Sequence, residues 1–256
     1  MNNNLSEGYI KLPSKWYDNF KITNEELTII ALLYRNYLHY QSISLCSVEI
    51  LCNYMYVNSN TNKRITKSIL DTILSLINKK YILNIYDLHY NQISINDISN
   101  KNYVFYVELP LPPENAFFII ENMDIDKIFY HLQNSNLGKF NLIRYFIACR
   151  RVCSNESSFG YLTQSKLKGL VSNTQTIQRY NKILQDELHL IRYNNSYLTP
   201  DKHYCTTFIG LYNDKDNFDN QVIGEVERQG LVYTNKIDSN LNRSKTQKLN
   251  NKNFDF

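Results

Sequence analysis

Amide and basic side chains recur on one face of a short amphipathic segment near the middle of the chain. At 100° per residue, Ile177 and Tyr180 fall on one side of a helix, whereas Gln175, Arg179, Lys182 and Asp186 fall on the other. Arginine can donate to guanine O6 and N7, and glutamine can pair with adenine in a major groove. The predicted chemistry is therefore non-covalent recognition of DNA bases.

The same arrangement occurs 112 residues earlier in the chain. With this offset, Ile65 aligns with Ile177 and Lys67 aligns with Arg179. Thr174 and Thr176, near the N-terminus of the helix, would hold DNA phosphates. Lys202 and His203, at a loop tip, would reach a neighbouring stretch of the DNA backbone. Alternatively, both faces are solvated or dock a protein. The candidate DNA-binding residues are Asn62, Lys63, Arg64, Lys67, Thr174, Gln175, Thr176, Gln178, Arg179, Lys182, Lys202 and His203.

Local signals predict the elements that position the first set of residues. Thr23 and Glu26 form a capping box that starts one helix, and Ser47 precedes a second. A third helix is expected over 63–79. The period then changes to two, which predicts strands at 82–86, 93–95 and 102–108. Helices followed by a strand pair are the outline of a winged helix.

The second stretch follows the same order. Its first helix contains Ile143 and Ile147, Thr163 caps the next, and Ser172 or Asn173 caps the third. A turn at 194–196, a strand at 197–199, a tip at 200–203 and a return strand at 204–209 complete the expected pattern. The predicted fold class is mainly α with small β wings (α+β), as two tandem winged helix-turn-helix domains.

Prolines and composition divide the chain into segments. The stretch 109–113 holds three of the five prolines and can continue neither a helix nor a strand. Residues 213–256 are dominated by polar side chains and are expected to form a disordered tail. The predicted division is a first domain at 1–109, a connecting helix within 110–136, a second domain at 137–212 and the tail at 213–256.

Composition and motifs argue against catalysis. The net charge is only +4, so nucleic-acid affinity would come from local clusters of cations. The five histidines are isolated, no phosphate-binding G-x-x-x-x-G-K-[ST] motif occurs, and no catalytic triad is evident. We therefore expect no enzyme activity, no metal and no cofactor.

Cysteine usage and the N-terminus point to the cytoplasm. The five cysteines form no C-x-x-C pair and lie in apolar segments, which favours reduced, buried thiols. The first residues lack the basic and apolar regions of a signal peptide, and no apolar run is long enough to span a membrane. The expected localisation is cytoplasmic, without membrane contact.

Over residues 20–212 the chain resembles the tandem winged-helix replication initiators and DnaD-like replication proteins of Gram-positive plasmids and phages. The resemblance rests on the two helix-turn-helix patterns and their wings. One departure is the turn Leu170–Asn173, where such motifs usually carry glycine; here Gly169 lies earlier. The resemblance implies a sequence-specific protein that binds double-stranded DNA, with host replication proteins or a second copy as further partners.

Three hypotheses follow from these features. A replication initiator of a plasmid or phage-like element would place both domains on repeated origin sites. A transcriptional regulator would bind an operator. A docking scaffold would use the same helices for proteins instead of DNA. We favour the initiator, because no separate ligand-sensing domain is evident and two dissimilar modules suit asymmetric repeats.

Overall fold

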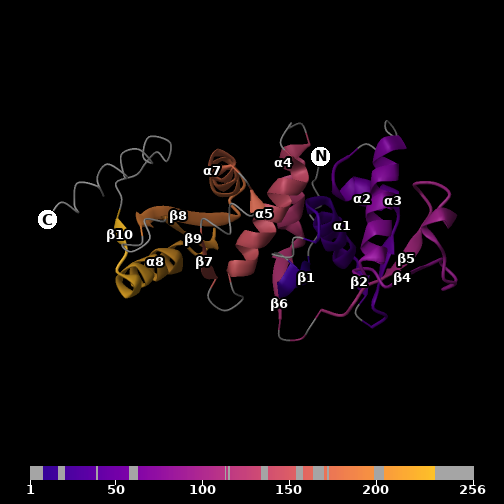
Figure 1. Ribbon diagram of the computed structural model, residues 1–256, viewed down its shortest axis with the longest axis horizontal. Coiled ribbons are helices and arrows are strands. Elements are labelled where there is room, and N and C mark those ends of the chain that lie inside the picture. Colours follow the sequence, from indigo (N-terminus) through magenta and orange to yellow (C-terminus); the bar gives the residue numbers. More distant parts are fainter. Residues whose placement is uncertain are drawn as a thin grey trace.

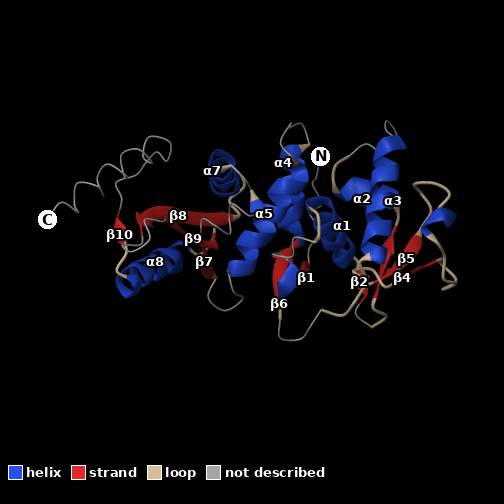
Figure 2. Cartoon of the chain, in the orientation of Figure 1, coloured by secondary structure: helices blue, strands red, loops and turns tan. Residues whose placement is uncertain are grey.

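The computed structural model describes residues 8–16, 21–38, 40–57, 63–112, 114, 116–133, 138–153, 158–163, 170–171, 173–198 and 205–233. Helices and small antiparallel sheets alternate along the chain, which makes the fold α+β (Figures 1 and 2). In the part that is described, no helix combines the length and the apolar character needed to cross a membrane.

The first unit spans residues 24–108, and its other elements pack around the largely buried helix α1. Its four-stranded sheet has the order β2-β3-β5-β4, with antiparallel neighbours throughout. The elements of this unit are α1 (Asn24–Arg35), β2 (Tyr37–Leu38), β3 (Ile43–Cys46), α2 (Val48–Tyr54), α3 (Lys63–Asn78), β4 (Asn84–Tyr86), the 3-10 helix η2 (Ile95–Asp97) and β5 (Phe105–Glu108).

Both predicted helix starts of this unit are confirmed. Thr23 Oγ1 accepts from the Glu26 backbone N–H, while Glu26 Oε2 accepts from the Thr23 backbone N–H at 2.7 Å. Ser47 caps α2 by accepting from the Ile50 N–H. Short side chains that satisfy free N–H groups set these helix starts locally, and so the sequence predicted them.

The predicted strand at 93–95 is wrong. Its last residue begins η2, because the Ser94 hydroxyl accepts from Asn96 N–H and the Asp97 carboxylate accepts from Ser94 N–H. These local side-chain bonds close a helical turn in place of a sheet ladder. The observed strands β4 and β5 are also shorter than the predicted ranges.

The second unit spans residues 139–211 and repeats the strand order of the first. The strand β9 lies between β7 and β8, just as β5 lies between β3 and β4. Its elements are α5 (Lys139–Val152), β7 (Phe159–Thr163), α7 (Thr174–Lys182), the π-helical turn η3 (Ile183–Glu187), β8 (Ile191–Leu198) and β9 (Cys205–Leu211).

One local prediction in this unit is wrong, and another falls outside the described residues. The expected turn at 194–196 is wrong, because these residues lie within β8, where a register shift between Asn194 and Tyr197 accommodates them as an irregularity. Thr163 is the last residue of β7, and the helix that it was expected to cap falls at 164–169, outside the described residues.

The expectation of disorder from residue 213 onward is wrong for 215–233. The helix α8 (Lys215–Gln229) and the strand β10 (Val232–Tyr233) follow the second unit, and β10 pairs with β8. Phe218 and Val222 bury their side chains against Phe208 of the sheet. A polar sequence folds here because its few apolar side chains share one face and meet a ready apolar surface. The remainder of the expected tail, 234–256, lies outside the described residues.

The segment before α1 and the predicted connecting segment join the two units. The strand β1 (Tyr9–Pro13) pairs with β6 (Phe117–Glu121), which leads into the expected connecting helix, α4 (Asn122–Leu132). Next to this ribbon α1 packs against α5, so segments far apart in sequence lie side by side at the centre of the molecule (Figure 1). One hydrophobic core therefore runs through both units.

Buried charges reinforce this joint. Arg35 of α1 and Asp126 of α4 form a two-pronged ion pair, with Nη1–Oδ1 and Nη2–Oδ2 distances of 2.5 and 2.8 Å, and both side chains are buried. The buried Arg144 of α5 donates to the Ile22 carbonyl at 2.6 Å. Arg150 donates to the Ile119 carbonyl at 3.0 Å, so it holds β6 and does not merely cap its own helix.

The cysteines match the expectation of buried thiols where they are described. Cys46, Cys52, Cys149 and Cys153 are free and buried. Burial raises the pKa of the Cys153 thiol to about 12, because the thiolate would lose its hydration. These four side chains therefore act as small apolar core residues.

Candidate nucleic-acid interface

The helix α7 carries six of the twelve predicted contact residues. Asn173 caps it, with Oδ1 accepting from the Gln175 N–H at 2.8 Å. Ile177 and Tyr180 are buried beneath the helix. Gln175, Arg179 and Lys182 are exposed, and Thr174, Thr176 and Gln178 are half-buried. The structure therefore gathers these six predicted residues on one helix above a buried row.

Two contacts that the sequence did not reveal hold α7 in place. The Tyr145 hydroxyl of α5 donates to Asn181 Oδ1 at 2.6 Å, and both residues are buried. Burial raises the pKa of Tyr145 well above its usual value, so this hydroxyl stays protonated as a donor. One turn further on, Gln185 Oε1 accepts from the Tyr193 N–H at 3.0 Å and ties η3 to β8. The exposed face is thus fixed to the core and to β8.

The corresponding helix of the first unit, α3, presents fewer described candidates. Arg64 and Lys67 are exposed on its first two turns. Lys63 begins the helix, but its side chain is not described, and Asn62 lies outside the described residues. Lys202 and His203, the predicted tip of the second wing, also lie outside them.

Acidic side chains flank the exposed face of α3. An open groove of about 450 Å³ runs between this face and the start of α1, and it is lined by Arg64 and Lys67 together with Glu25, Glu26 and Asp71. In the same groove, Ser68 donates to Glu25 Oε1 at 2.9 Å. Carboxylates so close to the two cations oppose the approach of a phosphate backbone. Sequence reasoning missed Glu25, because some 40 residues separate it from α3.

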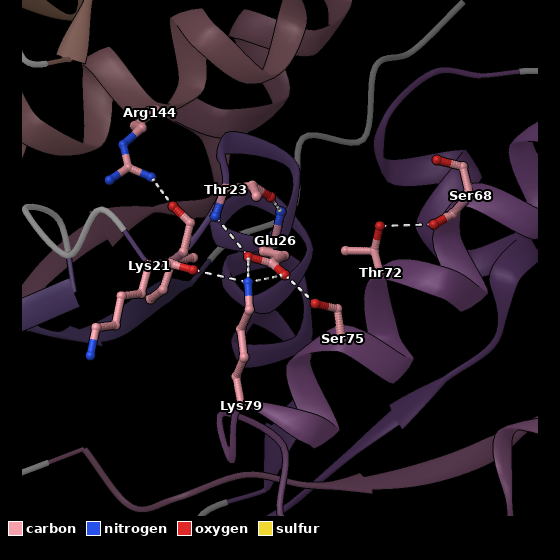
Figure 3. Close-up of polar contacts among 9 residues, drawn as sticks. Lys21, Thr23, Glu26, Ser68, Thr72, Ser75, Lys79 and Arg144 are labelled. Atoms are coloured by element: carbon pink, nitrogen blue, oxygen red, sulfur yellow. Dashed lines mark hydrogen bonds and ion pairs between the residues drawn. The ribbon is translucent and has the colours of Figure 1, made fainter.

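Glu26 is neutralised within this groove by a network of donors (Figure 3). Lys79 Nζ lies 2.7 Å from Glu26 Oε1, and the Ser75 hydroxyl donates to the same oxygen at 2.6 Å. Burial by itself raises the pKa of Glu26, but the bonds from Lys79, Ser75 and the Thr23 N–H outweigh it and leave the pKa lowered. Lys79, just beyond the end of α3, therefore pairs with α1. Glu25 and Asp71 remain as the acids beside the candidate cations.

The other flank of α3 has an apolar centre between polar side chains. A smaller groove of about 280 Å³ between α3 and η2 is lined by Leu70, Leu74 and Ile95 together with Thr66, Lys67, Asp71 and Asn96. Leu74 is 40% exposed, which is high for a leucine on a folded surface and suits contact with another apolar group. The two grooves share Lys67 and Asp71, but only the second adds apolar side chains, those of Leu70, Leu74 and Ile95.

Metal chemistry finds no support in the described residues. Among them, no three His, Cys, Asp or Glu side chains converge on a point where a metal ion could bind.

Comparisons with known proteins give structural likenesses but no family. No protein-family model matches the chain, and no curated protein matches it. A solved structure described as the crystal structure of Pi initiator protein in complex with iteron DNA is similar, with a TM-score of 0.44 and 11% sequence identity. The match covers 80% of this chain and 97% of that chain.

Proposed function

We propose that this protein binds double-stranded DNA through two winged-helix units, with α7 as the main recognition helix. The observation that carries the proposal is the face of α7, where Gln175, Arg179 and Lys182 are exposed above the buried Ile177 and Tyr180. Such a helix can enter a major groove, with its amides and guanidinium directed at base edges.

The strand order supports the winged-helix interpretation. In both units a helix (α1 or α5) precedes a strand (β3 or β7), and a later helix (α3 or α7) leads to a strand pair. The last strand of that pair (β5 or β9) lies between its partner and the earlier strand. This arrangement places α3 and α7 at equivalent positions. The two strands after each helix are those that would form the wing.

The acids beside α3 suggest that the two units contribute differently to DNA binding. Arg64 and Lys67 could reach phosphates from the first two turns, but Glu25 and Asp71 would repel a backbone lying deeper along the helix. The first unit would then add a few phosphate contacts, while the second reads the bases.

The biological role that we propose is initiation of replication on a plasmid or phage-like element, without enzymatic activity. The ion pair between Arg35 and Asp126 and the β1–β6 ribbon hold the two units together, which suits two adjacent sites on one duplex. A footprint of repeated sites near an origin, whose deletion lowers copy number, would support initiation. A single site at a promoter would instead support transcriptional regulation.

A titration tests DNA binding itself. Duplexes selected from random DNA by the full chain would be titrated with the wild type, Arg179→Ala and a control, Arg228→Ala, whose side chain is 64% exposed on α8. We expect Arg179→Ala to weaken binding by on the order of 10- to 100-fold and Arg228→Ala to change little. Failure to select any duplex, or equal affinity of all three proteins, would contradict the proposal.

The first unit has a second candidate function, which is docking of a protein segment. The apolar groove of Leu70, Leu74 and Ile95 beside the charged groove favours this alternative for α3. If Arg64→Ala and Lys67→Ala each leave DNA affinity and its salt dependence unchanged, the first unit does not contact DNA and the docking alternative holds for it.

A further inference from the structure

The outer faces of the two sheets occupy equivalent positions but are built differently. In the second unit Tyr161 lies opposite Phe208, and Phe159 lies opposite Gly210. In the first unit the same positions hold Leu45 opposite Tyr106, and Ile43 opposite Glu108. The register therefore places Glu108 where the second unit has glycine.

The helix α8 covers this face in the second unit only. A Cβ atom on Gly210 would lie 2.4 Å from Phe218 Cδ2, so glycine is what allows the ring of α8 to seat on the sheet. In the first unit the Glu108 carboxylate occupies that place and accepts from the Tyr86 hydroxyl and the Asn84 amide, each at 2.7 Å. A helix cannot pack here as α8 does, because a charged, hydrogen-bonded group would have to be buried.

The wing loop of the first unit holds an aromatic side chain over this face. Tyr90 stacks on Tyr106, with ring centroids 5.1 Å apart and planes inclined by 13°. Its backbone has φ +64°, a left-handed conformation that is unfavourable for tyrosine. Asp87 maintains it by accepting from the His89 and Asn91 N–H groups at 2.8 and 2.9 Å. Local hydrogen bonds therefore hold Tyr90, a residue that is 53% exposed, in a fixed position.

We call the surface formed by Leu45, Tyr86, Tyr90, Tyr106 and Glu108 the tyrosine face. Aromatic rings beside carboxylates are the groups that bind ammonium and guanidinium side chains, through cation–π and ion-pair interactions. Glu108 and the neighbouring Asp87 would repel nucleic-acid phosphates. The chemistry of the tyrosine face therefore fits a basic peptide better than DNA.

The chain itself contains a segment of matching charge. Residues 234–256 include five Lys or Arg and two Asp, with the cations concentrated at Arg243, Lys245, Lys248 and Lys252. The segment follows β10, which lies at the opposite end of the long axis from β4 and β5 (Figure 1). We propose that the tyrosine face of one copy binds the basic segment 234–256 of a second copy, so that the chains associate head to tail.

Charge reversal in the full chain tests this proposal. One variant carries Glu108→Lys, and the other carries Lys245→Glu with Lys248→Glu. Sedimentation velocity over a range of concentrations should show self-association of the wild type, and at least tenfold weaker association of each variant alone. An equimolar mixture should regain association, because one variant keeps an unaltered tyrosine face, the other keeps an unaltered basic segment, and the two altered surfaces are again opposite in charge. Such recovery would also exclude binding within one chain.

A milder pair of variants guards against misfolding. Tyr90→Asn removes the ring but tolerates the left-handed backbone, and we expect it to weaken association several-fold while thermal unfolding is unchanged. The control is Tyr161→Ala, which removes an exposed ring at the equivalent face of the second unit. A monomeric wild type at all concentrations, unaltered association of Glu108→Lys and Tyr90→Asn, an equal loss in Tyr161→Ala, or no recovery in the mixture would each overturn the proposal.

DNA titration of the same variants keeps this proposal separate from the proposed function. Glu108→Lys and Tyr90→Asn should retain base-specific affinity at protein concentrations below those of self-association, because α7 is untouched. If no duplex binds but the charge-reversed mixture associates, the proposed function fails and the head-to-tail contact stands.

Discussion

The two units share one order of three strands, yet their surfaces differ in two places that could meet a partner. The exposed face of α7 carries amides and cations, with the exposed acids Asp186 and Glu187 following it in η3, whereas α3 has Glu25 and Asp71 beside its cations. The outer sheet face is covered by α8 in the second unit and carries the hydrogen-bonded Glu108 in the first. The buried residues that form the scaffold are repeated, while the exposed ones are free to specialise.

The comparison also shows where the units depend on each other. The strand pair β1–β6 and the contact of α1 with α5 place residues of both units in one core. Removing a group from this joint should therefore cost more than removing one from either outer surface.

The largest expected effect comes from breaking the buried pair at the joint. Asp126→Ala leaves the Arg35 guanidinium buried without its carboxylate, and it should lower the free energy of unfolding by about 3–5 kcal/mol. Urea unfolding followed by circular dichroism measures this loss. Glu225→Ala, which removes the partner of the exposed Arg228, is the control and should change stability little. Equal effects of the two substitutions would show that the joint is not a stabilising element.

The next effect contrasts the equivalent positions Gly210 and Glu108. Gly210→Ala places a methyl group against Phe218 and should destabilise the second unit by about 2–3 kcal/mol, because α8 must shift. Glu108→Ala removes two hydrogen bonds at a half-buried site and should cost only about 1 kcal/mol. Thermal unfolding of both variants tests the difference. If Gly210→Ala left the stability unchanged, the packing of α8 would not depend on the close contact of Phe218 with Gly210.

DNA affinity should separate the two helices by a smaller amount. We expect Arg179→Ala to lose about 1–3 kcal/mol of binding free energy at one base position. Lys67→Ala should mainly reduce the slope of log affinity against log salt by about one unit. Glu25→Gln should strengthen binding a few-fold, because it removes an acid beside Arg64 and Lys67. Titrations at two salt concentrations measure all three, and weaker binding of Glu25→Gln would contradict the proposed repulsion.

The smallest effects are opposite pH dependences of two carboxyls. The lowered pKa of Glu26 means that its contribution to stability is present above about pH 4.5 and is lost as the pH falls through its folded pKa. Burial and the nearby Glu121 raise the pKa of Asp124 from 3.8 to about 6, so its protonation adds stability as the pH falls from about 6 toward 4. Urea unfolding at pH 7, 5 and 3.5 should show each dependence disappear in Glu26→Gln and Asp124→Asn respectively. A wild-type pH profile retained by either variant would assign the dependence to other groups.

The sequence by itself determined the helices that carry the candidate site. The caps at Thr23, Ser47 and Asn173 depend on bonds over two or three residues, and the apolar period of α3 and α7 depends on neighbours within one helix. These signals are short-range, so the starts of these helices and the exposed side of α7 could be predicted from the residues alone.

Only the tertiary structure decided how these elements meet. The pairing of β1 with β6 and the approach of Glu25 to Arg64 join residues that are distant in the chain, and the packing of Phe218 beside Gly210 depends on how α8 folds back on the sheet. No local pattern encodes such contacts, because strand pairing and charge proximity depend on which surfaces the core brings together. For the same reason the sequence predicted residues 215–233 to be part of a polar tail, although a few apolar side chains are enough to order them on an existing sheet.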